Sequence, residues 1–336
     1  MENKIEFSFR YLIPKVLYAC LTSMTACDTA DDKLLFEDKI LIDKGASNIN
    51  LEVKSGTDNV ILASFLAFPS ATPAKLKTVM VMHGSGGPWD DDDTNGDGIA
   101  DLCHPGQLSN QSEAWKNLLI ANGFAVVFVD SYSSRGTCEN EGDYKKPPLK
   151  FKISGTFVRN RDAYDVLTML SKLTWKDSEQ PVIDMNNVAI LGFSDGGTSV
   201  ISTLYDVQAT PPSWVWKQSF DGVVYTNEIL PPPAVTTKFK TGVIYYPGAY
   251  HNGYYGNVCT DKGIYRSYAD VMIHLAGGDP LTENSECLIT TMQRLGGGTA
   301  TVHRYADADH GFDNNDEPES SLARERTVLF LKSKLQ

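Results

Sequence analysis

The chain has 336 residues, of which 42% are hydrophobic, and its formal net charge is -12. This length and composition suffice for one large domain with a full core. The acidic balance and the lack of any dense Lys and Arg cluster argue against a nucleic-acid partner, because such partners are held by basic patches. The sequence also contains no apolar run of the ~18 to 20 residues that a membrane helix requires.

Residues 1 to 27 are predicted to be an export leader. Basic residues precede an apolar stretch from Val16 to Ala26, which is the order of features in a signal peptide. Cys27 then follows two small residues and resembles the lipid-acceptor cysteine of bacterial lipoproteins. We expect a periplasmic, outer-envelope or extracellular protein whose only route to a membrane is a lipid anchor at Cys27. A cytosolic extension with a free cysteine is the alternative.

Residues 36 to 336 are expected to form one α/β domain. The β-like runs Leu51 to Val53 and Val60 to Phe68 suit an opening antiparallel hairpin. Apolar β-rich runs then alternate with helical stretches, a rhythm that predicts a mostly parallel central sheet flanked by helices. The expected strands lie at 78–82, 124–129, 188–191, 242–246, 271–275 and 301–305, and the expected helices at 112–122, 156–173 and 319–335.

Two segments do not fit this rhythm and are predicted to be insertions at loop level. One is the acidic, Gly-rich segment 87–107, and the other is the Pro-, Trp- and Tyr-rich segment 206–240. Open α/β sheets bind ligands in loops at the carboxyl ends of their strands, so we expect both insertions there, where they would set substrate specificity. Arg135, Arg159 and Arg161 are candidates for contact with an anionic substrate, with structural ion pairing as the alternative.

Four cysteines follow the predicted leader, namely Cys103, Cys138, Cys259 and Cys287. An even number in an exported chain indicates two disulfides, and none of the four has the CxxC spacing of zinc sites. Three pairings are possible. We favour Cys103 with Cys138 and Cys259 with Cys287, and buried free thiols are the alternative.

The predicted strand 188–191 runs into Gly192-Phe193-Ser194-Asp195-Gly196, followed by a stretch with helical potential. This is the G-x-S-x-G pattern, in which a strained strand-to-helix turn exposes the serine hydroxyl. Glycines at its flanks let the strand and the helix approach closely. Ser194 is therefore the predicted nucleophile, and a chance match in a Gly-rich turn is the alternative.

The predicted strand 78–82 ends in His83-Gly84-Ser85-Gly86-Gly87. A flexible turn of this kind can point backbone N–H groups at a developing oxyanion. We expect the oxyanion hole to consist of the Asp195 N–H, directly after the nucleophile, and an N–H near Ser85 or Gly86. An ordinary strand-to-helix turn is the alternative.

A serine hydroxyl needs a base that takes its proton, and the base needs an orienting acid, which follow in the order Ser, Asp or Glu, His. His310 lies just past the last predicted strand, where a loop can carry an imidazole over the sheet. Asp279 follows the strand before it and is the predicted acid. Its alternative role is a helix N-cap, and Asp307 and Asp309 are rival acids.

These motifs resemble the dienelactone hydrolase-like members of the α/β-hydrolase superfamily over roughly residues 75 to 335. The matching pieces are 83–87, 129–132 with 135–136, 192–196, 278–279 with Cys287, and 310–312. The resemblance implies the α/β-hydrolase fold and hydrolysis of a small-molecule or polymer ester through an acyl-enzyme, without a catalytic cofactor. The prototype has a cysteine nucleophile and lacks both insertions, so its lactone substrate is not carried over.

The insertion 87–107 contains a candidate calcium loop. Its predicted ligands, spaced as at the start of an EF-hand loop, are Asp93, Asn95, Asp97, the Ile99 carbonyl and Asp101. About a dozen residues here also resemble a thrombospondin type 3 calcium repeat. We expect a structural Ca²⁺ rather than a catalytic one, and a solvated acidic loop is the alternative.

Two other functions stay open at this point. One is a serine peptidase of the same fold, and the other is a non-catalytic, calcium-dependent binding protein that keeps the fold as a scaffold.

Overall fold

The structure is a computed structural model that describes residues 39–70, 75–98, 100–138, 154–220, 223–226, 233, 235–248, 254–256, 258–259 and 263–336. The predicted leader with Cys27 lies outside the described residues, as does Ile99 of the acidic loop. Among the helices in the described ranges, none has the length and apolar character needed to cross a membrane.

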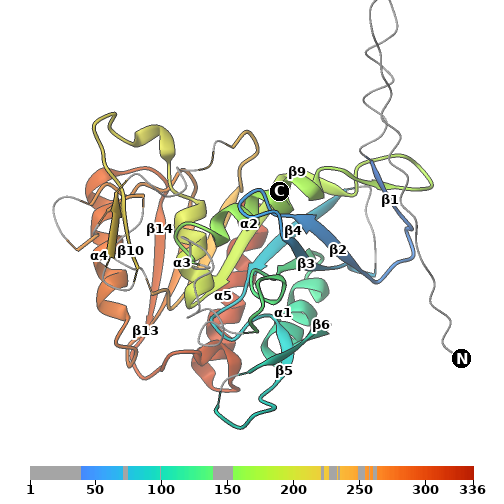
Figure 1. Cartoon of the computed structure of the whole chain (residues 1–336), viewed down its shortest axis with the longest axis horizontal. Helices are drawn as coiled ribbons and strands as arrows, with labels where there is room; N and C mark the ends of the chain where they lie inside the picture. The colour runs from blue at the N-terminus through green and yellow to red at the C-terminus, as the bar shows by residue number, and fades with distance from the viewer. Residues whose placement is uncertain are drawn as a thin grey trace, which may run out of the picture. The chain divides into compact units, whose positions relative to one another are not determined.

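Residues 39–336 are built around an eight-stranded sheet with the order β14-β13-β12-β9-β4-β7-β3-β2 (Figure 1). β3 pairs antiparallel with both of its neighbours, whereas all other neighbours in this sheet pair parallel. The opening hairpin and the mostly parallel sheet are therefore confirmed. The strands are β2 (Asn48–Lys54), β3 (Ile61–Ala67), β4 (Leu76–Met82), β7 (Ala125–Val129), β9 (Ile183–Phe193), β12 (Thr241–Tyr245), β13 (Val271–Ala276) and β14 (Ala300–Tyr305).

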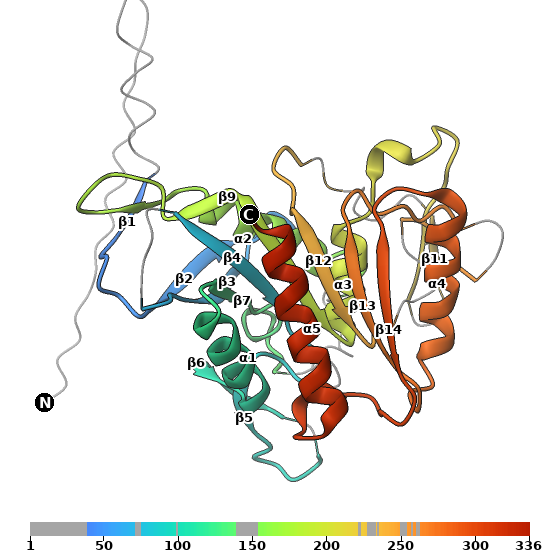
Figure 2. The ribbon, with the colours of Figure 1, turned by 180° about the vertical axis from the view of Figure 1, so that it is seen from behind.

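In the part of the chain that the structure describes, five α-helices cover the two faces of this sheet, and Figures 1 and 2 show the faces in turn. α1 (Asn110–Ala121) and α5 (Pro318–Lys334) share one apolar core with the sheet, and the other three share a second. Those three are α2 (Arg159–Leu170), α3 (Asp195–Thr203) and α4 (Thr282–Leu295). The strand order, the single antiparallel strand and the helices on both faces are those of the α/β-hydrolase fold.

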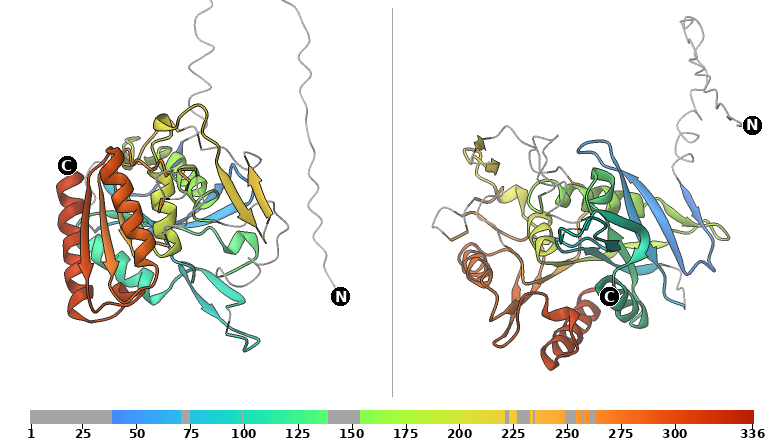
Figure 3. Two further views of the ribbon diagram at one scale, coloured as in Figure 1. Left: turned by 90° about the vertical axis from the view of Figure 1, so that its left-hand side faces the viewer. Right: turned by 60° about the horizontal axis from the view of Figure 1, so that its bottom comes forward.

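The insertion 87–107 is a β-hairpin, not an irregular loop. β5 (Trp89–Asp92) pairs antiparallel with β6 (Leu102–Leu108), and Figure 3 shows this hairpin projecting away from the sheet. It follows β4 and therefore begins at the carboxyl ends of the strands, as expected.

The insertion 206–240 is placed differently from the prediction. Its described parts include the short η3 (Val207–Ala209) and the hairpin of β10 (Lys217–Phe220) and β11 (Val223–Thr226). Because the segment joins the end of α3 to the start of β12, both of its ends lie at the amino-terminal edge of the sheet. The expectation that it sits at the carboxyl ends of the strands is therefore wrong.

The described residues include two disulfides. Cys103 is bonded to Cys138, with 5.3 Å between the Cα atoms, and Cys259 is bonded to Cys287, with 4.7 Å. Both separations lie within the usual range for disulfides, and the pairing is the favoured one of the three. The first bond ties β6 to the chain after η1 (Ser133–Arg135), and the second ties a surface segment to α4.

Candidate active site

Ser194 stands on a strained turn between β9 and α3. Its φ is 51° and its ψ is -116°, a backbone conformation that residues other than glycine seldom adopt. The Ser194 N–H donates to the Tyr245 carbonyl across a distance of 3.1 Å, which anchors the turn to the neighbouring strand. Strain of this kind persists only where the surrounding structure holds it, and here it places the hydroxyl at the carboxyl edge of the sheet.

The flanking glycines are required by close backbone contacts. A Cβ atom added at Gly192 would lie less than 3.0 Å from the Gly196 carbonyl, and one added at Gly196 would clash with the carbonyls of Met82 and His83 in the same way. In the turn from Gly192 to Gly196, the backbone therefore packs directly against its own backbone and against that at the end of β4. This is the physical reason for glycine at both positions of the motif.

The structure brings Ser194, His310 and Asp279 together. Nε2 of His310 lies 2.8 Å from Oγ of Ser194, and Nδ1 of His310 lies 2.6 Å from Oδ2 of Asp279. The Asp279 side chain is 2% exposed and that of His310 is 40% exposed, so the acid is buried behind a base that substrate can reach. A buried carboxylate at Nδ1 holds the imidazole with Nε2 facing the serine.

Asp279 faces His310 and is not the N-cap of the following helix, because α4 has Leu281 at that position with no side-chain capping bond. Its Oδ2 faces His310, and its Oδ1 accepts a hydrogen bond from the Leu281 N–H, 2.9 Å away, at the start of α4. The rival acids Asp307 and Asp309 are both exposed. The carboxylate of Asp309 lies against Gly278 instead.

The turn of residues 84–87 lies beside the nucleophile. The Gly84 carbonyl accepts from the Gly87 N–H at 3.4 Å, and a Cβ atom on Gly84 would stand 3.7 Å from that of Ser194. Ser85 and Gly86 lie within this turn, and Asp195 begins α3 directly after Ser194. The predicted oxyanion donors are thus carried by two segments that meet at the serine.

Arg159 is a buried residue of this site whose role sequence reasoning missed. Its guanidinium, at the start of α2, bonds to the Asp195 carboxylate and donates from Nη2 to the His83 carbonyl at 2.6 Å. Arg135 pairs instead with Asp58 and Asp162. For these two arginines the structural alternative therefore holds. The available signal was Asp195 itself, because a buried carboxylate next to a nucleophile needs a cationic partner.

A second buried network lies behind His310. The Asp313 carboxylate accepts from Trp115 Nε1 at 2.7 Å, from Gln111 Nε2 at 2.9 Å and from the Tyr246 hydroxyl. Burial raises the pKa of Asp313, and the three donors oppose that shift. The Tyr246 ring packs against the His310 ring with 4.7 Å between their centroids. The network therefore fixes the tyrosine ring that packs against the imidazole.

The acidic loop between β5 and β6 uses its carboxylates internally. Asp93 accepts from the N–H groups of Gly96 and Gly98 at 2.6 and 2.8 Å, and Asp101 accepts from the Thr94 hydroxyl at 2.6 Å. Across the ranges that the structure describes, no three His, Cys, Asp or Glu side chains converge as metal ligands would. These bonds lie within the loop, and the predicted ligand Ile99 lies outside the described residues, so the calcium site stays a prediction.

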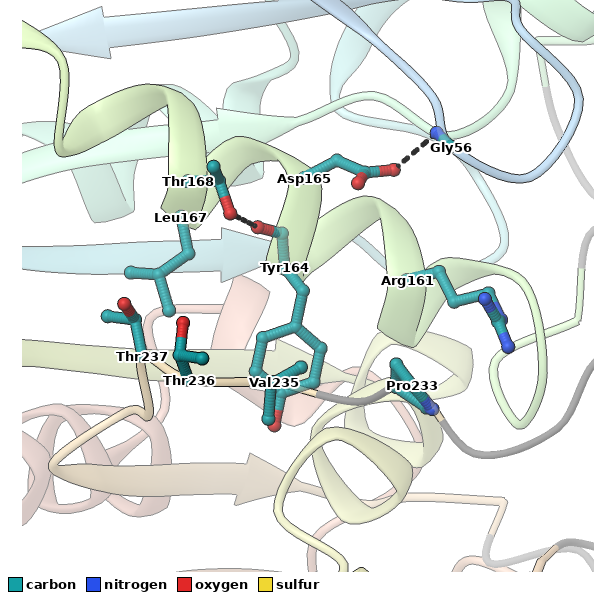
Figure 4. Close-up of a pocket in the computed structure, with 10 residues that line it drawn as sticks. All are labelled: Gly56, Arg161, Tyr164, Asp165, Leu167, Thr168, Pro233, Val235, Thr236 and Thr237. Atoms are coloured by element: carbon teal, nitrogen blue, oxygen red, sulfur yellow. Dashed lines mark hydrogen bonds between the residues drawn. The ribbon is translucent and has the colours of Figure 1, made fainter. Parts of the chain in front are cut away.

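A cavity of about 240 Å³ lies apart from the serine, between α2 and residues 233–237 (Figure 4). Asp165 in its wall accepts from the Gly56 N–H at 2.8 Å, and the Thr168 hydroxyl donates to the Tyr164 carbonyl at 2.9 Å. Neither Ser194 nor His310 lines it, so we do not place the substrate there.

The fold and the geometry at Ser194 define an α/β-hydrolase fold that carries a Ser–His–Asp constellation at the carboxyl edge of its sheet. No protein-family model matches the sequence, and no curated protein matches it significantly. Similarity to solved structures, at sequence identities of 14%, supports the fold alone.

Three of these structures illustrate the similarity. Esterase 2 of Thermogutta terrifontis, phosphoramylated by tabun, has a TM-score of 0.54, with 86% of this chain and 96% of that one covered. A putative dienelactone hydrolase from Klebsiella pneumoniae has a TM-score of 0.52, with 85% and 99% covered. Dipeptidyl peptidase 4 of Porphyromonas gingivalis, at 14% identity, has a TM-score of 0.52; 86% of this chain matches, but it spans only 35% of the peptidase.

Proposed function

We propose that this chain is a serine hydrolase that cleaves carboxylic esters through an acyl-enzyme intermediate. The observation that carries the proposal is the continuous hydrogen-bonded series from Asp279 through His310 to Ser194, with donor–acceptor distances of 2.6 and 2.8 Å. The strained serine turn and the adjacent glycine turn add the two other parts that acyl transfer needs, an accessible nucleophile and a place for the oxyanion.

In the first half of the reaction, His310 Nε2 takes the proton of Ser194 as the serine oxygen bonds to the ester carbonyl carbon. The carbonyl oxygen becomes an oxyanion, which accepts hydrogen bonds from the Asp195 N–H and from an N–H of the 84–87 turn. The tetrahedral intermediate then collapses, and His310 gives its proton to the departing alkoxide.

In the second half, a water molecule replaces the alcohol. His310 takes one proton from the water as its oxygen attacks the acyl carbon, and the same proton returns to Ser194 when the acid departs. Asp279 accepts from the Nδ1–H of His310 throughout and stabilises the imidazolium that forms in each half.

The substrate class is a small-molecule or polymer ester. Esterases and dienelactone hydrolase-like proteins among the similar structures favour this choice, and an alcohol leaves more readily than an amine. We also propose that the protein is exported, which its two disulfides support. The lipid anchor at Cys27 remains a prediction.

The test is hydrolysis of p-nitrophenyl acetate, butyrate and octanoate by residues 28–336, beside the variant Ser194→Ala. We expect turnover by the wild type and loss of at least about 10³-fold in kcat for the variant. The preferred acyl length then reports the size of the acyl site. Turnover of peptide substrates but not esters would favour the peptidase. An inert wild type would favour a binding protein.

A further inference from the structure

The Arg159 guanidinium is a fully buried charge with an unusual set of partners. It bonds to the Asp195 carboxylate, to the His83 carbonyl at 2.6 Å and to the Tyr132 hydroxyl at 3.4 Å, and its Cζ lies 5.0 Å from the centre of the Tyr132 ring. The Tyr132 hydroxyl in turn donates to Asp195 at 3.2 Å. Burying a charge is costly unless it is paired, so these contacts fix the guanidinium in one place.

The two main partners of Arg159 belong to the two backbone segments that flank the nucleophile. Asp195 directly follows Ser194 and supplies one proposed oxyanion donor. The His83 carbonyl begins the 84–87 turn, which supplies the other. One side chain therefore connects both halves of the proposed oxyanion hole, from a helix that belongs to neither half.

The bond to His83 also constrains the direction of the turn. A trans peptide unit is planar, so its C=O and N–H point in opposite directions, and holding the His83 carbonyl orients the Gly84 N–H. The Gly84 carbonyl is held in turn by the Gly87 N–H and by His83 Nδ1, which donates at 2.6 Å. That second peptide unit carries the Ser85 N–H, whose direction is thereby set as well.

The surroundings of His83 fix the tautomer and the charge of its imidazole. The Ser131 N–H donates to its Nε2 at 3.4 Å, which leaves the proton on Nδ1 for the bond to Gly84. Burial lowers the pKa of His83 well below its ordinary value, and the nearby Arg159 charge acts in the same direction. The imidazole therefore stays neutral and keeps this tautomer.

We infer that Arg159 is a positioning residue of the oxyanion hole, which holds the Asp195 N–H and the Ser85 N–H at the spacing that the tetrahedral intermediate requires. The inference rests on the proposed function and deepens it. Arg159 does not touch the substrate. It acts by fixing Asp195 and His83, and a lysine in its place cannot hold both because it lacks the planar, forked donors.

The experiment compares an aryl butyrate with the corresponding aryl thionobutyrate, in which sulfur replaces the carbonyl oxygen. Sulfur is larger and accepts hydrogen bonds more weakly than oxygen, so the thionoester gains less from an aligned oxyanion hole. For Arg159→Lys we expect kcat on the ester to fall about 10²-fold while KM changes less than about threefold. The ester-to-thionoester ratio of kcat/KM should fall about tenfold or more, because thionoester turnover loses less.

Arg135→Lys is the matched control, because Arg135 is also a buried arginine in an ion-paired network but does not contact the serine turn. It should lower thermal stability and leave the ratio at the wild-type value. Asp195→Asn, which keeps the backbone N–H and removes the charge that Arg159 holds, should lower the ratio as Arg159→Lys does. It provides the readout if Arg159→Lys does not fold.

The inference is overturned if the Arg159 and Asp195 variants slow both substrates by one common factor, or slow neither. The wild type alone separates this outcome from failure of the proposed function. A wild type inert toward the ester and the thionoester would remove the serine hydrolase proposal and this inference with it, before any variant is compared.

Discussion

The substitution Gly196→Ala has two opposing effects on stability, a gain in helix propensity and a clash with backbone atoms. Gly196 lies in the first turn of α3, where alanine would ordinarily stabilise a helix by about 1 kcal/mol relative to glycine. Here the added Cβ would stand less than 3.0 Å from the carbonyl oxygens of Met82 and His83, and both are backbone atoms that cannot rotate away. Overpacking costs about 1 to 3 kcal/mol, and the two backbone clashes place this cost at the upper end, so after the helix gain we expect a net destabilisation of about 2 kcal/mol.

Activity should fall more steeply than stability, because the clash separates the serine turn from the 84–87 turn. A displacement of about 1 Å between reacting groups can cost about 10²-fold in rate, which is the loss of kcat we expect. The assays are urea unfolding at pH 7 and hydrolysis of p-nitrophenyl butyrate. Gly45→Ala is the control, since a Cβ there meets nothing within 4 Å. A Gly196→Ala protein as stable and active as the wild type would show that this contact does not hold the two turns together.

Three further predictions concern stability. Burial lowers the pKa of His274 well below 6.5, so the folded chain keeps this imidazole neutral whereas the unfolded chain protonates it. The free energy of unfolding should therefore fall as the pH drops below about 6.5. In urea titrations, His274→Gln should lose about 2 kcal/mol less unfolding free energy than the wild type between pH 6.5 and 5. Equal slopes would contradict this. Replacing Cys103 and Cys138 by serine opens a link across 35 positions and should cost about 3 to 4 kcal/mol of unfolding free energy; an unchanged urea midpoint would contradict it. Ca²⁺ should raise the melting temperature above that in chelator, whereas identical melting curves would argue for a solvated acidic loop.

The sheet could be predicted because its central strands are buried on both faces. Every residue of β7, β12 and β13 is buried, and such strands appear in the sequence as continuous apolar runs. Asp279 and His310 could be placed near each other because they follow β13 and β14, and the carboxyl ends of neighbouring parallel strands lie at one edge of the sheet.

Other features were not predicted from the sequence. The strand β5 is largely a run of aspartates, and its one apolar residue, Trp89, is too little to predict a strand that pairs with β6. α4 was not predicted although a signal existed, because its buried residues Ser285, Leu288, Ile289 and Met292 have the i, i+3, i+4, i+7 spacing of an amphipathic helix. The bond between Arg159 and Asp195 joins residues 36 positions apart on different helices, and only tertiary packing brings them together.

The assignment of Ser194 as an activated nucleophile is tested by the reaction of residues 28–336 with a labelled fluorophosphonate, followed by peptide mapping. We expect one label per chain, on Ser194, and a labelling rate lowered about 10²- to 10⁴-fold in His310→Ala, because the base that activates the serine is then missing. No label on the wild type, a label on another residue, or labelling of His310→Ala as fast as the wild type would contradict this assignment.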